Sequence, residues 1–445
     1  MLVGVVVVEP ARSWTNSVAP PLHDTDDQAS TSAPIVRARF LRRPLTALDR
    51  SGGVRARLRD GGPIAVLPRW SRRSTEQGSA RQTPPMDFGI CVASRPADLP
   101  YIQLAESLGY THCWMGDSQM LWSDVYAMLA LAAERTTTMR IGTGVAVAST
   151  RPAPVTAAAL ATINQLAPGR VFCGIGTGNT AMRIMGHKPM PLAEFDEYLE
   201  TLRPLLSGGE VSYRWRGKRA PIHHLMPDAG FVNFSDPIPL YVSAFGPRAM
   251  GIAARQGDGM ITSVPPDPAA VARVRAALAA AKDSHSHSFT RSTFPLSTLT
   301  TVLVLQPGER LSSERVRRQT GAFAIAALHY AYEQWVQFGR RPGHQFDGVW
   351  DDYVELVETA PPGRRHLRIH AGHNCWVEPD EAHFVTPELI SRTCLVGRPD
   401  DLAERIRALE TAGLDQLVIL PPLAEKEAVI REFAEQVIPL LTAEA

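Results

Sequence analysis

From residue 86 onward, short continuous apolar runs alternate with segments whose apolar residues recur at helical spacing. Continuous apolar runs are typical of parallel strands that are covered on both faces. Strands are predicted at 88–92, 111–115, 139–148, 171–175, 239–243, 259–262, 296–305 and 416–420. Helices are predicted at 96–108, 125–134, 155–166, 195–206, 247–255, 268–281, 400–412 and 425–441. Right-handed βαβ units repeated eight times close into a (β/α)8 TIM barrel. An open doubly wound sheet is the alternative, because periodicity does not reveal closure.

Two stretches interrupt this rhythm. The shorter covers 207–236. The longer runs from 306 to 398, after the seventh predicted strand, and contains helical patterns near 314–339 and 350–358. Long insertions after barrel strands commonly form substrate pockets and lids.

The first 85 residues differ in composition from the remainder. They contain 13 arginines, 7 acidic residues and no lysine, and from residue 11 they are rich in Pro, Ser, Gly and Arg without a sustained period. Such a segment cannot bury enough apolar surface to order itself. The apolar start from Leu2 to Val8 lacks the basic residues and cleavage site of a secretory signal. We therefore predict a disordered extension over 1–85 and one barrel domain over 86–445. An arginine-rich targeting or binding arm is the alternative for the extension.

Composition and charge exclude several classes of protein for this 445-residue chain. Lys plus Arg number 46 and Asp plus Glu 45, so the net charge of +1 lacks the basic footprint of a nucleic-acid binder. No apolar run reaches the roughly 20 residues of a transmembrane helix. The 5 cysteines form no C-x-x-C pair, which argues against a disulfide framework and a zinc ribbon. We predict a cytoplasmic location, with no nucleic-acid or membrane partner.

The loop after the second predicted strand contains two candidates for contact with a substrate. Active sites of such barrels lie at the C-terminal ends of the strands. Asp117 could hold a polar group of the substrate, and Trp122 could provide an aromatic wall. Alternatively, Asp117 or Ser118 caps the following helix.

Three further loops offer charged or backbone groups to an anion. Arg151, after the third strand, is placed for an anionic ligand, although a surface arginine at a helix start is commoner. The glycine-rich turn 174–179 lacks the G-x-G-x-x-G spacing, but its N–H groups can face an anion or a flat ring. After the fifth strand, Pro247 takes the expected first position of a helix, whose free N–H groups suit a phosphate.

His370, His373 and Cys375 are candidate metal ligands by residue type alone. Their spacing matches no standard site, and H-E-x-x-H is absent. Because they lie inside the long insertion, lining a pocket is the favoured role, and no metal is predicted. The chain also lacks a G-x-S-x-G elbow and a Walker sequence, the usual signals of serine hydrolases and nucleotide phosphotransfer.

These motifs together resemble the luciferase-like monooxygenase superfamily. The resemblance rests on 142–152, 174–179 and 244–249, with Asp117 and the closing stretch 395–403. It is strongest to methylene-tetrahydromethanopterin reductase and related oxidoreductases that use the deazaflavin coenzyme F420. It extends from residue 86 to about residue 441.

The resemblance implies a flavin or deazaflavin at the C-terminal mouth of the barrel, with its ring over the third and fourth strands. It also implies a non-proline cis peptide between Gly144 and Val145. The implied cofactor side comprises Gly144, Val145, Arg151, Gly176, Thr177, Gly178, Asn179, Gly246, Pro247 and Arg248, and the substrate side comprises Asp117 and Trp122. Sugar-phosphate dehydrogenases of the superfamily have an Asp-His pair after the second strand. The pair here is Asp117-Ser118, which argues against oxidation of glucose 6-phosphate.

The predicted function is hydride transfer between the cofactor and a small organic substrate held under the insertion. We expect F420 ahead of FMN as the cofactor. One alternative is a two-component monooxygenase that uses reduced FMN and oxygen, with a flavin reductase as its partner. A non-catalytic barrel that only holds a cofactor is the other. We also expect a homodimer.

Overall fold

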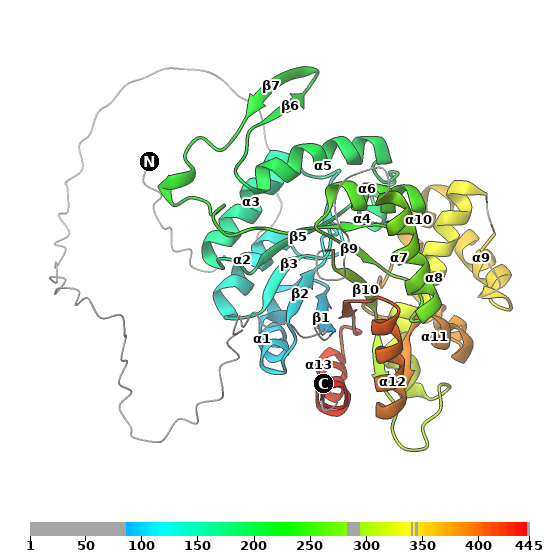
Figure 1. The fold of residues 1–445 in the computed structure, drawn as a ribbon. Helices are drawn as coiled ribbons and strands as arrows, with labels where there is room; N and C mark the ends of the chain where they lie inside the picture. Colours follow the sequence, from blue (N-terminus) through cyan, green and yellow to red (C-terminus); the bar gives the residue numbers. More distant parts are fainter. Residues whose placement is uncertain (1–85, 283–293, 340, 343–345, 443–445) are drawn as a thin grey trace, which may run out of the picture. The chain divides into compact units, whose positions relative to one another are not determined.

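The computed structural model describes residues 86–282, 294–339, 341–342 and 346–442. The extension predicted over 1–85 lies outside these residues. Parallel strands form a closed barrel (Figure 1), in the order β1 (Asp87–Val92), β2 (His112–Met115), β3 (Arg140–Thr143), β5 (Val171–Gly176), β8 (Leu240–Ser243), β9 (Gly259–Thr262), β10 (Leu296–Thr300) and β13 (Gln416–Ile419). Asp87 of β1 lies opposite Gln416 of β13, which closes the ring. The TIM-barrel prediction is confirmed, and the open sheet is wrong.

Helices surround the strands and cover their outer faces (Figure 1). The larger ones are α1 (Leu99–Ser107), α2 (Val125–Arg135), α3 (Ala153–Leu166), α5 (Leu192–Leu206), α6 (Pro247–Gln256), α7 (Pro268–Lys282), α12 (Pro399–Thr411) and α13 (Lys426–Gln436). Shorter ones are η1 (Pro96–Asp98), α4 (Asn179–Arg183) and α14 (Ile438–Thr442). Their apolar faces contribute Leu129, Leu160 and Leu199, which are fully buried in one core with the strands. This burial is the main stabilising term of the fold.

Two of the predicted strands are each divided in two. The stretch predicted over 139–148 forms β3 and then β4 (Ala146–Val147), separated by a cis peptide between Gly144 and Val145. The cis peptide that the resemblance implies is therefore present. The stretch predicted over 296–305 forms β10 in the barrel and β11 (Val302–Val304), which pairs instead with β12 (Leu395–Gly397). The single long strands were wrong because buried, strand-forming residues continue across both changes of pairing.

Aromatic side chains fill the barrel interior, and glycines allow two of its strands to approach each other closely. The ring centroids of Trp114 and Phe172 are 4.5 Å apart, and Tyr241 lies against both. A Cβ at Gly142 would lie 2.3 Å from the carbonyl oxygen of Phe172, and one at Gly174 would lie 2.2 Å from that of Thr143. Glycine at these positions permits the close approach of β3 and β5.

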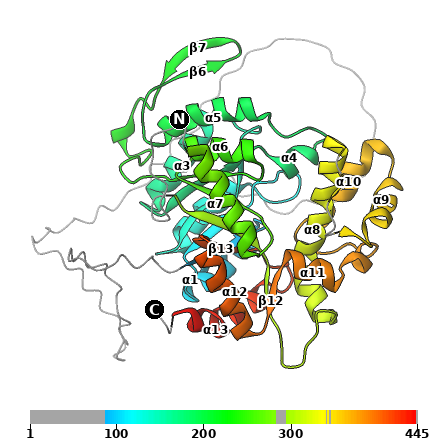
Figure 2. The ribbon, with the colours of Figure 1, turned by 45° about the vertical axis from the view of Figure 1, so that its right-hand side comes forward.

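Both insertions form structure of their own. The shorter contains a hairpin of β6 (Val211–Trp215) and β7 (Lys218–Ile222), followed by η2 (Pro227–Ala229). The longer carries α8 (Glu314–Phe338), α9 (Trp350–Glu358), η4 (Pro362–Arg364), α10 (Arg365–Ile369), η5 (Ala382–Phe384) and α11 (Pro387–Thr393). These helices gather on one side of the barrel (Figures 1 and 2) around a separate apolar cluster that includes Leu328 and Tyr353. The helical segments predicted near 314–339 and 350–358 are confirmed.

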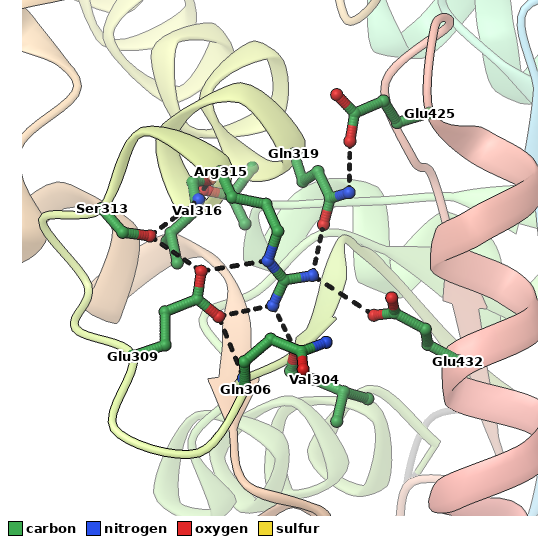
Figure 3. Close-up of polar contacts among 10 residues, drawn as sticks. Val304, Gln306, Glu309, Ser313, Arg315, Val316, Gln319, Glu425 and Glu432 are labelled. Atoms are coloured by element: carbon green, nitrogen blue, oxygen red, sulfur yellow. Dashed lines mark hydrogen bonds and ion pairs between the residues drawn. The ribbon is translucent and has the colours of Figure 1, made fainter.

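Arg315 fixes the start of α8 to the last barrel helix (Figure 3). Its guanidinium donates to Glu309 at 2.5 Å, to Glu432 of α13 at 3.3 Å and to the carbonyl oxygen of Val304 at 2.8 Å. Gln319, one turn further along α8, bonds to Glu425. The insertion is thus anchored to the barrel at the root of its longest helix.

Candidate active site

Asp117 follows β2 and connects it to β4. Its Oδ2 accepts a hydrogen bond from the backbone N–H of Val147 at 3.1 Å. Burial raises the pKa of this carboxyl above its ordinary value, because a desolvated carboxylate is disfavoured. The alternative that Asp117 or Ser118 caps the next helix is wrong. The cap of α2 is Asp124, whose Oδ1 accepts from two backbone N–H groups at 3.0 Å each.

The charge of Arg151 is neutralised within the chain. Its guanidinium lies 2.5 Å from Asp124 Oδ2 and 4.3 Å from the centroid of the Tyr126 ring. Opposite charge and the ring face both favour this position. Arg151 therefore lies in a partly exposed ion pair at a helix start, and its contact with an anionic ligand stays a prediction.

Trp122 brings the loop after β2 against the long insertion. Its ring covers Gly116, where a Cβ would lie 2.3 Å from the indole, so the close packing requires glycine. The centroid of the His373 ring is 6.1 Å from that of Trp122. A residue predicted on the substrate side therefore lies beside the histidine-rich stretch of the insertion.

The histidines of that stretch make contacts within the protein. His373 Nε2 lies 2.9 Å from Asn374 Nδ2 and 3.5 Å from Thr180 Oγ1. Burial, together with the nearby His370 and His329, holds the pKa of His373 well below its usual range, so the imidazole is neutral at pH 7. Within the described part of the chain, no group of three His, Cys, Asp or Glu residues is arranged to hold a metal ion.

The glycine-rich turn after β5 is closely packed against β4. Gly178 has a φ of 81°, a conformation that glycine adopts without strain, and a Cβ there would lie 2.5 Å from Val147 Cγ1. The carbonyl oxygen of Thr177 accepts a hydrogen bond from Ser149 at 3.4 Å. The side chain of Asn179 points toward the long insertion, where its Nδ2 donates to Glu333 at 2.9 Å.

The start of α6 lies beside this turn and is open. Ile175 of β5 pairs with Val242 of β8, so the loops that follow leave the barrel next to each other. No side chain caps the first turn of α6, and a Cβ at Gly246 would meet nothing within 4 Å. Arg248 is exposed in the same turn. Uncapped N–H groups at a helix start attract an anion, so these residues fit the phosphate of a flavin or deazaflavin.

Sequence reasoning missed three residues of this region. Asp124 could have been found, since an aspartate directly before an apolar helical pattern is a typical cap. No local sequence pattern marks Glu333 or Arg183 as part of the site. Arg183 of α4 lies 3.5 Å from Glu333 of α8, and the two residues are 150 positions apart in the sequence. No local pattern could reveal that pairing.

Comparison with known proteins gives the family. The family profile described as luciferase-like monooxygenase matches residues 86–416. The chain therefore belongs to the luciferase-like monooxygenase family.

Three known proteins illustrate the similarity. A 5,10-methylenetetrahydromethanopterin reductase of Archaeoglobus fulgidus is 29% identical over 353 residues, which cover 77% of this chain and 94% of that protein. An F420-dependent glucose-6-phosphate dehydrogenase of Beutenbergia cavernae is 28% identical over 389 residues, covering 82% and 96%. The solved structure of the coenzyme F420 dependent tetrahydromethanopterin reductase of Methanopyrus kandleri superposes with a TM-score of 0.59 at 19% identity, covering 80% of this chain and 100% of that one. At this identity the superposition shows a shared fold.

Proposed function

We propose that this protein is an oxidoreductase that transfers a hydride between the deazaflavin coenzyme F420 and a small organic substrate. The observation that carries the proposal is the pair of adjacent loops after β5 and β8. One is the glycine-rich turn, and the other is the uncapped start of α6 with open space at Gly246. The F420-dependent relatives favour the deazaflavin over FMN.

The bound cofactor would supply or accept the hydride, and the chain would position the reactants and exclude water. The N–H groups of the Pro247 turn, with Arg248 nearby, would hold the phosphate. Asp117 and Trp122 would form the substrate side. Because Asp117 is already bonded to Val147, we infer that it shapes the loop as well as facing the substrate.

A sugar phosphate is disfavoured as the substrate. Apart from Arg248, which is assigned to the phosphate of the cofactor, several described cations near the mouth are paired with carboxylates: Arg151 with Asp124, Arg183 with Glu333, Arg95 and Lys426 with Asp98, and Arg368 with Asp380. Glu333 and Asp98 are buried, so drawing Arg183 or Lys426 away to a phosphate would leave a buried carboxylate unpaired at a free-energy cost. Together with Ser118 in place of a histidine, this pairing supports an uncharged substrate.

Titration of the purified chain with F420 and with FMN, followed by fluorescence quenching, tests the cofactor. We expect micromolar or tighter binding of F420. Binding of FMN with no detectable binding of F420 would replace the proposal with the monooxygenase and its flavin reductase partner. Binding of F420 without any redox change over a panel of alcohols, ketones and imines would favour the non-catalytic barrel.

We also propose a cytoplasmic homodimer. The cysteines are all free and buried, which suits a reducing compartment. An apolar groove of about 570 Å³ beside the hairpin, lined in part by Val155, Trp215 and Leu225, supports self-association. None of the described helices is long and apolar enough to cross a membrane. Sedimentation at several concentrations measures the oligomeric state, and a monomer throughout would contradict the dimer.

A further inference from the structure

Glu333 joins three separate parts of the protein. It lies near the end of α8, its side chain is 6% exposed, and its carboxylate accepts hydrogen bonds in two directions. Oε1 lies 2.7 Å from His370 Nε2, and Oε2 accepts from Asn179 Nδ2 at 2.9 Å. Arg183 Nε is 3.5 Å from Oε2 and also donates to Asn179 Oδ1 at 2.9 Å. The carboxylate thus bridges the insertion and the end of the glycine-rich turn.

The partners of Glu333 continue toward the substrate side. The rings of His370 and His373 have their centroids 5.3 Å apart, and His373 lies 6.1 Å from Trp122. Side chains in contact therefore run from Asn179, on the proposed cofactor side, to Trp122, on the proposed substrate side. Glu333 is the member of this series that bonds directly to the turn.

We propose that Glu333 is a positioning residue for the cofactor, through which the insertion holds the turn at Gly176–Asn179 in its binding conformation. The assignment rests on the proposed function, because it presumes that the turn contacts the cofactor. Without the bonds to Glu333, the Asn179 amide and the Arg183 guanidinium lose their buried acceptor. The turn must then be ordered when the cofactor binds, which lowers its affinity.

The structure contains a matched control for a purely structural role. Glu381, in the same insertion, lies 3.1 Å from His329 and is 1% exposed, but its described partners all belong to the insertion. Removing either carboxylate leaves a buried histidine without its acceptor and an arginine with one acceptor fewer, so both changes should destabilise the insertion by similar amounts. Only the change at Glu333 also releases the turn.

Titration with coenzyme F420 compares the wild type, Glu333→Leu, Glu381→Leu and Glu333→Gln, with unfolding measured on each. We expect Glu333→Leu to bind about tenfold more weakly, which corresponds to the loss of one charged hydrogen bond. Glu381→Leu should lose comparable stability but bind within about twofold of the wild type. Glu333→Gln should restore most of the affinity, because its amide oxygen can face Asn179 while His370 changes tautomer and accepts.

A second comparison keeps the assignment testable if Glu333→Leu fails to fold. Asn179→Ala removes the donor of the hydrogen bond to Glu333 and should weaken F420 binding to a similar degree. Amide hydrogen exchange without cofactor should be faster at 176–183 in Asn179→Ala than in the wild type.

The outcomes separate the two proposals. A wild type that binds F420, with Glu333→Leu and Glu381→Leu equally affected, would overturn the assignment of Glu333 alone. Unchanged affinity in Asn179→Ala would also overturn it. A wild type that binds neither F420 nor FMN would overturn the proposed function and this assignment with it.

Discussion

The backbone N–H of Val147 donates to Asp117 Oδ2 at 3.1 Å, which fixes β4 against the loop that follows β2. On its other side, Val147 packs against Gly178, where a Cβ would lie 2.5 Å away. Three consecutive loops at the mouth of the barrel are therefore held by contacts to one short strand. Changes at Asp117 should consequently alter stability as well as the substrate side.

Asp117→Leu should lower the free energy of unfolding by about 1–3 kcal/mol, because it leaves the N–H of Val147 buried without an acceptor. Asp117→Asn keeps an acceptor oxygen and removes a partly desolvated charge, so its stability should stay close to that of the wild type. Urea denaturation at pH 7 measures both. Equal losses in the two variants would mean that the hydrogen bond to Val147 does not stabilise the loop.

The ion pair between Arg315 and Glu309 at the start of α8 should make the free energy of unfolding depend on pH. Hydrogen bonds from Arg315, above all, lower the pKa of Glu309 from 4.5 to about 2. Between these values the unfolded chain binds more protons than the native one, so stability rises with pH. The contribution is fully present above pH 4.5 and is lost as the pH falls toward 2.

Glu309→Gln should therefore be less stable at pH 7 by about 2 kcal/mol, with a weaker dependence on pH below 5 than the wild type. Glu404→Gln is the control, because Glu404 is exposed and forms no ion pair with any described residue. Denaturation between pH 3.5 and 7 measures the difference. Parallel curves for the wild type and Glu309→Gln would contradict the role of this ion pair.

Gly246→Leu should weaken the binding of whichever cofactor is used by at least about tenfold, because a side chain there would intrude on the phosphate. Gly246 has a φ of −114°, which any residue adopts, and open space surrounds it, so the fold should be unaffected. Gly363→Leu, also in open space, is the control. Fluorescence titration gives the affinities. Unchanged affinity in Gly246→Leu would mean that the phosphate lies elsewhere.

A chain that begins at Met86 should keep the melting temperature and cofactor affinity of the full-length protein. The composition of 1–85 gives that segment no apolar face to pack on a barrel. Calorimetry and cofactor titration on both chains make the comparison. A loss of several degrees, or of expression, would assign a structural role to the extension.

The sequence alone located the eight barrel strands, the helices between them and the two insertions, but it joined β3 to β4, β10 to β11, and α13 to α14 as single elements. Most barrel strands are buried on both faces, so their residues form short apolar runs that can be recognised without knowing the neighbouring strands. β10 differs, because its buried residues include Ser297, Thr298 and Thr300.

The helix start at Pro247 was also recognisable, because proline reveals local backbone geometry. The turn predicted over 174–179 was too long: Gly174 and Gly176 belong to β5, and only Thr177 and Gly178 lie between β5 and α4. The point at which the stretch 296–305 leaves the barrel could not be predicted. Buried β-branched Thr300, Thr301 and Val302 join β10 to β11, and the two strands differ in the strands with which they pair.

Only the tertiary structure decided which charged and polar side chains are available to a ligand. Arg151 is neutralised by Asp124, and Asn179 is bonded to Glu333 across 154 residues of sequence. Such partners meet because the barrel closes and α8 is anchored against it, and the sequence near either residue contains no trace of the other. Local burial and backbone geometry are encoded in short segments, whereas the pairing of distant charges depends on the completed fold.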